Sequence, residues 1–322
     1  MNEKAAKSKM SFREFSALLN IGPILSLVVL CIIVGCLSDK FFTSFNLINI
    51  VKQITCYAVL GMGMTFVIIG GGIDISVGSQ VGLWAVVSSL IAVHTGSVPL
   101  AVITILALGA LTGFVQGSII AKLALPPFIV TMAAQMMLRG LITAITNGQP
   151  VTGLPDGLRW FGIGKIGPIS APIAICVVLF IIGHIVLTKT CTGRYIFALG
   201  SNRQATKVTG INVVKFQIIT YMVCGVCAAI ASLILTGRLG SALSNGGLGY
   251  EGDAIAATVV GGTSMSGGEG NLLGTFIGAA IMGVIRNGLN LLQIQAAWQD
   301  IAVGAVILFS VILDQLRVRR KE

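Results

Sequence analysis

Four uncharged amide side chains lie inside long apolar segments of this sequence, where polar groups are rare. They are Gln80, Gln116, Asn287 and Asn290. An amide both donates and accepts hydrogen bonds, so these side chains can exchange bonds with the hydroxyl groups of a passing solute. The same side chains can instead bond one helix to another in an apolar medium. Both interpretations stay open at this level.

Two acidic residues stand at the starts of apolar segments, and each has two interpretations. Asp74 follows a glycine pair and precedes Ser76, so it can cap a helix that begins there or serve as the hinge of a gate. Asp253 precedes the apolar run 254–260 and either caps it or contacts a partner protein. Capping is the simpler expectation for both carboxylates.

Motifs for covalent, hydrolytic or metal chemistry are absent from the sequence. The only Gly-Lys pair, Gly164-Lys165, lacks the upstream glycine and the following Ser or Thr of a phosphate-binding loop. Neither H-E-x-x-H nor Gly-x-Ser-x-Gly occurs, and the two histidines lie in separate segments. The seven cysteines show no disulfide framework, and Cys224 and Cys227 are expected to pack inside a helix. The chain is therefore expected to hold no metal and no cofactor, and not to be an enzyme.

The elements that must position these residues are membrane spans. Hydrophobic residues make up 55% of the 322-residue chain and charged residues 10%, against about 25% charged in a soluble domain. We predict an all-α polytopic protein with about ten transmembrane helices in one continuous domain over 21–314. Windows near the ~20 residues that cross a bilayer place the spans at 21–38, 54–70, 76–93, 98–121, 127–146, 171–188, 215–237, 254–268, 271–290 and 297–314.

The eighth predicted span is short and rich in glycine, so it is expected to be broken or re-entrant. Backbone that breaks at membrane depth must be shielded by protein or water. An internal repeat is also expected, because Gly71-Gly72 through Gly78 resembles Gly261-Gly262 through Gly268 and transporters are often built from duplicated halves. Gly109, Gly113 and Gly117 are spaced to let helices approach closely.

The basic residues are distributed unequally between the two sets of loops, and this asymmetry predicts the orientation. Fourteen lie on the side of the N-terminal segment 1–20, the loop 189–214 and the tail 315–322, against six on the other side. Both termini are therefore expected in the cytoplasm. Anionic lipid headgroups favour this placement and account for the net charge of +10 without nucleic acid. Arg139 alone lies well inside a span, and Arg286 is expected to reach out from a span end to the interface.

The loop 189–214 contains a short helix by its capping signals. Ser201 or Asn202 can cap its start, and Gly210 can close it in the left-handed conformation. Ala205 and Val208 are then expected on one face. Such a helix can dock a soluble partner or lie on anionic lipid, and the residues alone favour neither.

Several longer motifs, in the same order along the chain, resemble the permease family of ribose-type ABC importers. The resemblance runs from about residue 41 to the C-terminus. The motifs are Phe41-Phe42-Thr43 with Asn46-Leu47, Gly63-Met64-Thr65, Gly72-Ile73-Asp74-Ile75-Ser76-Val77-Gly78-Ser79, Gly193-Arg194-Tyr195, Gly210-Ile211-Asn212, Gly249-Tyr250-Glu251 with Asp253, Gly261-Gly262-Thr263-Ser264 and Asn287-Gly288-Leu289-Asn290-Leu291.

The resemblance implies an inner-membrane import subunit with several partners. These are a second permease chain, a cytoplasmic ATPase that holds ATP and Mg²⁺, and a periplasmic sugar-binding protein. It implies a small sugar as cargo, with ribose or a similar pentose as the first candidate. It also favours ATPase docking by the loop helix, although Gln204 stands where related loops often have Glu.

Three sets of residues are expected to carry the function if the resemblance holds. The coupling loop is assigned Arg194, Gly200, Asn202, Ala205, Thr206, Val208, Gly210 and Ile211. The translocation path or its gate is assigned Asp74, Ser76, Gln80, Gln116, Asn287 and Asn290. Contact with the binding protein is assigned to Glu251 and Asp253.

Two rival functions follow from the residues alone. A facilitator or secondary carrier working without an ATPase is the nearer one, although the scarcity of charge within the spans argues against ion coupling. A membrane enzyme is the weaker, because no nucleophile, metal set or acid-base pair is visible.

Overall fold

The computed structural model describes residues 12–319, and nearly all of its regular structure is helical. Residues 1–11 of the expected N-terminal segment and residues 320–322 of the expected tail lie outside the described part. The elements are α1 Phe12–Leu37, α2 Ser44–Ile69, α3 Val77–Thr95, α4 Val98–Leu123, α5 Pro127–Thr146, α6 Asp156–Ile163, β1 Lys165–Ile166, β2 Ile169–Ser170, α7 Ala171–Lys189, α8 Cys191–Ser201, α9 Arg203–Val208, α10 Val213–Leu239, α11 Tyr250–Val260, α12 Leu272–Leu291 and α13 Ala296–Arg319.

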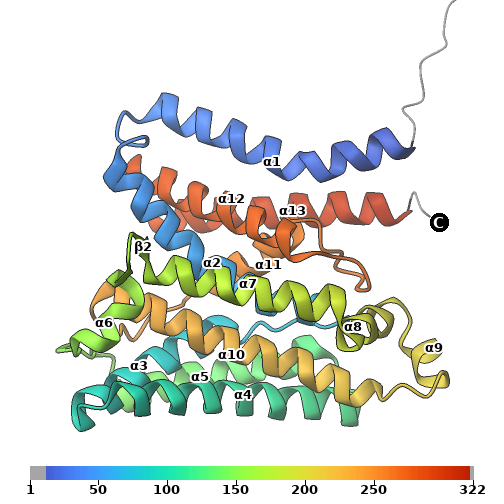
Figure 1. Ribbon diagram of the computed structural model, residues 1–322, viewed down its shortest axis with the longest axis horizontal. Helices are drawn as coiled ribbons and strands as arrows, with labels where there is room; N and C mark the ends of the chain where they lie inside the picture. Colours follow the sequence, from blue (N-terminus) through green and yellow to red (C-terminus); the bar gives the residue numbers. More distant parts are fainter. Residues whose placement is uncertain (1–11, 320–322) are drawn as a thin grey trace, which may run out of the picture.

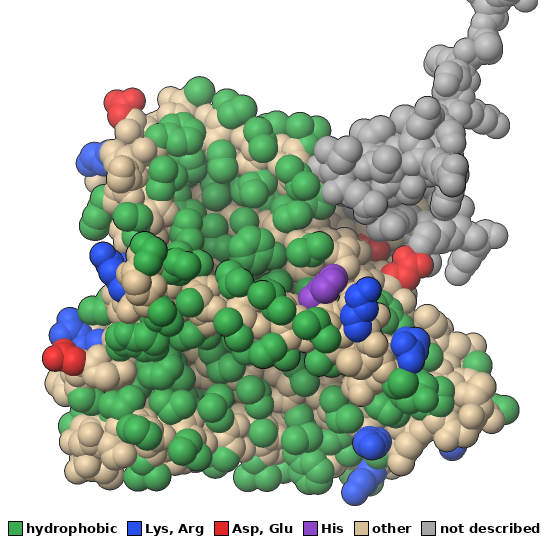
Figure 2. Space-filling view, viewed as in Figure 1, with side chains coloured by type: hydrophobic (Ala, Val, Ile, Leu, Met, Phe, Trp, Pro, Cys, Tyr) green, Lys and Arg blue, Asp and Glu red, His purple; other side chains and the backbone are tan. Residues whose placement is uncertain are grey.

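The long helices lie side by side along one common direction (Figure 1). Within residues 12–319, eight of them are long and apolar enough to cross a membrane: α2, α3, α4, α5, α7, α10, α12 and α13. Figure 2 shows hydrophobic side chains over the middle of the visible face and Lys and Arg near its two ends. The prediction of an all-α polytopic membrane fold is therefore confirmed.

Two ends of the molecule can be told apart in Figure 1. α8, α9 and the C-terminal end of α13 lie at one end, which we call the α8–α9 end. α6 and the antiparallel hairpin of β1 and β2 lie at the other, which we call the α6 end. The sequence predicted neither α6, nor the hairpin, nor α8.

Most predicted spans agree with the observed helices to within a few residues, and four differ. α1 begins at Phe12, well before the predicted start at 21 and inside the expected N-terminal segment. α2 begins ten residues before the predicted start at 54, because the Thr43 hydroxyl accepts a bond from the backbone N–H of Asn46 and caps the helix there. α13 extends to Arg319 through most of the expected tail. The segment 254–268 is not one helix, since α11 ends at Val260 and turns follow.

Glycine faces let α4 and α10 pack with their backbones close together. A Cβ on Gly113 would overlap the carbonyl oxygen of Tyr221, and a Cβ on Gly109 would lie 2.5 Å from the carbonyl oxygen of Gly225. The expected packing role of the α4 glycines is thus confirmed. Cys224 and Cys227 are buried, unbridged and packed against Gly63 of α2, as the sequence predicted.

The two glycine-rich segments that resemble each other end helices in the same way. The N–H groups of Gly70, Gly71 and Gly72 donate to the carbonyls of residues 66, 68 and 67 at the end of α2. The N–H groups of Gly261, Gly262 and Thr263 donate to those of residues 257, 259 and 258 at the end of α11. Gly70 therefore corresponds to Gly261, one residue away from the pairing that the sequence predicted.

Both segments also lie at the same end of the molecule, because the N–H of Gly268 donates to the carbonyl of Ile69 at 2.9 Å. The pair α2 and α3 therefore runs in the same sense as the pair α11 and α12. We call residues 70–76 the first break and residues 261–271 the second break.

The α4–α10 contact supplies a stability prediction. We expect Gly113→Leu to lower the apparent unfolding temperature of the detergent-solubilised chain, because the added side chain must displace the α10 backbone, a strain that costs about 1–3 kcal/mol. Gly304→Leu in α13 is the matched control, since no atom lies within 4 Å of a Cβ built there. Equal unfolding temperatures for the two variants would contradict the close approach of α4 and α10.

Candidate functional site: two helix breaks and the α8–α9 loop

The first break holds a fully buried polar cluster around Asp74. Its Oδ1 accepts bonds from the N–H of Ser76 at 2.9 Å and from the hydroxyl of Ser76 at 2.6 Å. The Nε2 atoms of Gln80 and Gln116 each donate to the Ser76 hydroxyl at 2.9 Å. Four of the predicted path residues are therefore together, contributed by the break, α3 and α4.

This geometry corrects the capping interpretation of Asp74. The residue at the N-cap of α3 is Ser76, and its side chain makes no capping bond. Asp74 instead folds the break onto itself, while the Tyr221 hydroxyl of α10 donates to the carbonyl of Ile73 at 3.2 Å. The break is thus held by its own carboxylate and by α10.

The cluster also carries unused hydrogen-bonding capacity. The Oε1 atoms of Gln80 and Gln116 and the hydroxyl of Ser79 are buried without a partner. Buried polar atoms are nearly always bonded in native structures, so a group of such atoms calls for an explanation. Amide oxygens that accept hydroxyl hydrogens are suited to a polar, uncharged solute.

Asn287 and Asn290 lie apart from this cluster and bond helices together. Asn287 exchanges two hydrogen bonds with Asn46, at 2.9 and 3.1 Å, and thereby joins α12 to α2. The Oδ1 of Asn290 accepts from Gln299 Nε2 at 2.8 Å. Of the two interpretations for these amides, the structure shows the helix-to-helix one.

Asp253 is buried and bonded to Arg286, which corrects two expectations. Arg286 Nε donates to both carboxylate oxygens of Asp253 at 3.1 Å, and Arg286 Nη1 lies 3.2 Å from Asp300. Arg286 therefore does not reach out to the interface. Asp253 does not cap α11, whose N-cap is Gly249. Its carboxylate is 0% exposed in this chain.

Glu251 is half-buried and also bonded within the chain. Its Oε1 accepts from Gln135 Nε2 of α5 at 3.1 Å. One turn along α5, Arg139 Nη1 donates to the carbonyl of Gly246 at 2.8 Å. No local pattern in the sequence predicts that Gln135, Arg139 and Glu251 lie together, and Arg139 is noticeable only as an isolated charge within a span.

The α8–α9 loop has the predicted local geometry at α9. Asn202 Oδ1 accepts from the N–H of Ala205 at 2.9 Å and caps the helix, and Gly210 has φ of +82° after its end. Ala205 and Val208 are both exposed, and Val208 keeps 87% of its surface. The expected apolar face of α9 is thus present and exposed, and its contact with a partner stays a prediction.

Two other residues assigned to coupling, Thr206 and Ile211, face the chain itself. The buried Thr206 hydroxyl donates to the carbonyl of Ala198 at 2.8 Å and fixes α9 on α8. Ile211 packs with Leu199 and Phe216. Arg194 is exposed, and its Nη2 lies 3.0 Å from the sulfur of Cys191. Through their contacts, Thr206 and Ile211 fix the position of α9.

Gly200 of α8 joins this loop to both breaks. A Cβ there would overlap the carbonyl oxygen of Ile69 and come within 2.6 Å of the N–H nitrogen of Gly268. A Cβ on Gly71 would in turn lie 3.6 Å from the Cα of Gly200. We call Ile69, Gly71, Gly200 and Gly268 the glycine junction. It places α8 directly against the bond that ties the two breaks together.

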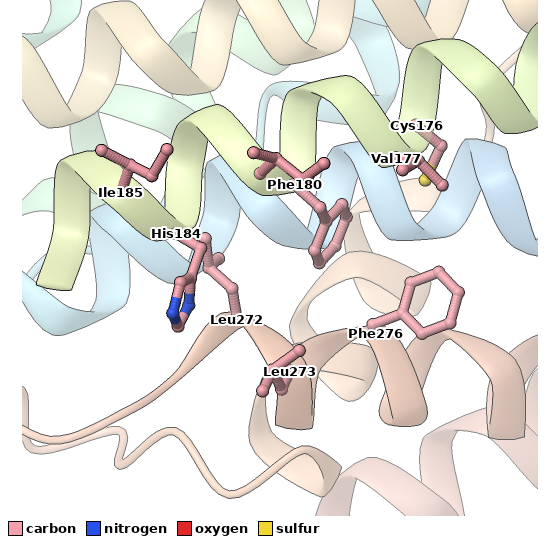
Figure 3. Close-up of a pocket in the computed structure, with 9 residues that line it drawn as sticks. Cys176, Val177, Phe180, His184, Ile185, Leu272, Leu273 and Phe276 are labelled. Atoms are coloured by element: carbon pink, nitrogen blue, oxygen red, sulfur yellow. The ribbon is translucent and has the colours of Figure 1, made fainter.

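An apolar groove lies elsewhere, between α7 and α12. Figure 3 shows Phe180 and His184 of α7 facing Leu273 and Phe276 of α12, around a cavity of about 290 Å³. The two phenyl rings meet edge to face at 5.4 Å. His184 is the only polar side chain in this lining, so the groove does not suit a polyhydroxylated solute. Within residues 12–319, no cluster of His, Cys, Asp and Glu could hold a metal.

Comparison with known proteins confirms the expected resemblance. Residues 46–311 match the family described as the permease component of branched-chain amino acid transport systems. No solved structure matches the chain.

The curated relatives include import permeases for several sugars. The chain is 45% identical over 296 residues to the ribose import permease protein of Escherichia coli K12, covering 90% of this chain and 92% of the relative. It is 40% identical to the ribose import permease protein of Bacillus subtilis 168, covering 92% of each. It is 34% identical to the galactose/methyl galactoside import permease protein of Escherichia coli K12, covering 98% and 100%.

The glycine junction predicts a local change in backbone protection. Gly200→Ala should speed amide hydrogen exchange in residues 261–271, because the new methyl group displaces the carbonyl that holds the Gly268 N–H. Loss of one such bond costs about 1 kcal/mol, or about fivefold in the opening equilibrium. Gly140→Ala is the control, with no atom within 4 Å of its added Cβ. Unchanged exchange in 261–271 would show that α8 does not support the second break.

Proposed function

The chain belongs to the permease family of these import systems, and we propose that it forms the membrane path for a monosaccharide in an ATP-driven importer. Ribose or a similar pentose is the proposed cargo. The observation that carries the proposal is the 45% identity to a ribose import permease over nine-tenths of the chain. The buried amide cluster at the first break supports it, because it offers unused acceptors to an uncharged polyol.

The proposed importer contains four kinds of part. A second permease chain, identical to this one, completes the path, and a periplasmic binding protein delivers the sugar. A cytoplasmic ATPase holds ATP and Mg²⁺, while this chain binds no cofactor and hydrolyses no ATP. The exposed face of α9 with Ala205 and Val208 is where we place the ATPase, since an uncovered apolar knob on a capped helix is suited to a cleft in a soluble partner.

The proposed topology places the protein in the cell inner membrane, with both termini and the α8–α9 end on the cytoplasmic side. The distribution of Lys and Arg supports that orientation. Ten crossings result if α1 and the broken segment 240–260 each cross once beside the eight long helices. The segment 240–249 would then enter the membrane as backbone shielded by α3 and α5, as irregular backbone at that depth requires.

Reconstitution tests the function directly. Liposomes are prepared with this chain in the membrane, its ATPase and ATP in the lumen, and the binding protein outside. They should accumulate D-ribose in the lumen only when ATP is present there. Omitting the ATPase should abolish uptake. Rapid equilibration of ribose through the permease alone would instead identify a facilitator, and accumulation by the chain alone would identify a secondary carrier.

The coupling face predicts a transport defect without a folding defect. Ala205→Glu should insert normally and lose both uptake and sugar-stimulated ATPase activity, because docking would bury an unpaired carboxylate at a cost of several kcal/mol. Lys207→Gln is the matched control on the same helix and should retain transport. Gly210→Val should act like Ala205→Glu, because a β-branched residue resists φ of +82°.

Normal uptake by Ala205→Glu at wild-type abundance would show that α9 is not the coupling helix. Loss of uptake in both Ala205→Glu and Lys207→Gln, with ATPase still bound, would place the contact on the opposite face.

A further inference from the structure

Three side chains form a second polar group, separate from the Asp74 cluster, where α5 meets the start of α11. Gln135 and Arg139 are one turn apart on α5, and Glu251 lies in the first turn of α11. Gln135 Nε2 donates to Glu251 Oε1, and Arg139 Nη1 donates to the Gly246 carbonyl just before α11. No ion pair joins Arg139 to Glu251 within the described residues.

The group leaves its strongest hydrogen-bonding atoms unused. Arg139 Nε and Nη2 and Glu251 Oε2 are all buried without a partner. A buried donor or acceptor without a hydrogen bond costs free energy, and the cost is greater on a charged group than on a neutral one. Several bonds orient the two side chains. Arg139 Nη1 donates to the Gly246 carbonyl, and the Glu251 carboxylate accepts from Gln135 and from the backbone N–H groups of residues 249 and 251.

The unused atoms have a specific geometry. Nε and Nη2 are the two donors on one edge of the planar guanidinium, which presents them as a fork to two neighbouring oxygens. Glu251 Oε2 supplies the complementary acceptor. An anionic ligand would meet the Glu251 carboxylate and a cationic ligand the Arg139 guanidinium. A neutral ligand with adjacent hydroxyl groups fits both, because its oxygens accept from the fork and one of its hydroxyls donates to Oε2.

α3 provides bare backbone beside this group. A Cβ on Gly78 would overlap Glu251 Oε2, and a Cβ on Gly82 would lie 3.1 Å from Arg139 Nη1. Gln135 and Arg139 are only half-buried, so the group is partly exposed on its α5 side. Gly247 and Gly249, with φ of +69° and +81°, flank the turn that enters α11.

We propose that Arg139 and Glu251 form a monosaccharide-binding station on the membrane path. The Nε–Nη2 edge of Arg139 binds two adjacent hydroxyl oxygens of the sugar, and Glu251 Oε2 accepts a hydroxyl hydrogen. Gln135 is a positioning residue that holds the carboxylate. The inference rests on the proposed function and adds to it the residues that recognise the cargo within the membrane.

Direct binding tests the station without the binding protein. Purified full-length chain in lipid nanodiscs is mixed with millimolar D-ribose, and saturation transfer from the protein to the sugar protons is measured by NMR. Wild-type chain should transfer saturation. Arg139→Lys, which keeps the charge but loses the fork, and Glu251→Gln should each weaken binding about tenfold or more, as expected for removal of one charge-assisted hydrogen bond.

Arg159→Lys is the matched control, because it makes the same chemical change in a guanidinium that is 46% exposed on α6. It should bind D-ribose like wild type. Wild-type saturation transfer in both Arg139→Lys and Glu251→Gln at normal abundance would overturn the proposal. Absence of transfer to wild-type chain would also overturn it, since the unused atoms would then be occupied by water alone.

Transport by the reconstituted importer separates this inference from the proposed function. Wild-type uptake of D-ribose tests the function. Given that uptake, Arg139→Lys and Glu251→Gln should each raise the KM for D-ribose or lower the maximal rate of uptake about tenfold. Wild-type kinetics in both variants would refute the station and leave the importer standing. Loss of unloaded ATPase activity together with wild-type ribose binding would assign the pair a purely structural role and refute it equally.

Discussion

Wherever a helix ends, the backbone groups that it frees must find hydrogen-bond partners elsewhere in the chain or in solvent. The two breaks meet this constraint in the same way. Each ends its helix with three backbone bonds of identical spacing, donated by Gly70 to Gly72 in one case and by Gly261 to Thr263 in the other. The left-handed glycines Gly71 and Gly262 then turn the chain away. The N–H of Gly268, farther along the second break, donates to the last carbonyl of α2.

That shared bond makes the two breaks one unit, and α8 is built onto it. Gly200 has no side chain because the Ile69 carbonyl and Gly268 occupy the space that a Cβ would take. α9 is tied to α8 through Thr206, so its exposed apolar face is two contacts away from both breaks. A partner that pulled on α9 would therefore act on Asp74 and its amide cluster at one break and on the start of α12 at the other. Packed backbone transmits such a displacement because it cannot deform continuously.

Much of the fold could be predicted from the sequence because apolar length is a strong signal for a span. Prediction of the helix bounds from apolar length failed where a polar residue stands early in a helix, as at Asn46. It also failed where an apolar window such as 254–268 combines a helix with a turn. The amphipathic helix α8 was missed because its internal Gly193 and Gly200 suggested a loop, whereas both are close-packing positions in the structure.

The site was predicted less completely, and for a different reason. Asp74, Ser76, Gln80 and Gln116 could be named from their residue types and local context, and they prove to share one cluster. Long-range pairings could not be named. Arg286 and Asp253 are 33 positions apart, and Gln135 and Glu251 are 116 apart. No local pattern indicates such partners. The sequence therefore predicts a cap or a binding-protein contact for Asp253, a binding-protein contact for Glu251 and an interfacial position for Arg286.

These contacts predict that α8, α9 and the two breaks move as one body when the importer works. Spin labels at Lys207→Cys on α9 and Ser266→Cys in the second break, both exposed positions outside the Ala205–Val208 face, report the distance between them by double electron-electron resonance in a background with Cys36→Ser and Cys191→Ser. A second labelled pair, Ser266→Cys with Thr95→Cys on the far end of α3, supplies a reference. Between nucleotide-free and ATP-bound importer, we expect an unchanged distance from 207 to 266 and a changed distance from 266 to 95. A change between 207 and 266 with a constant distance from 266 to 95 would show that α9 moves independently of the breaks.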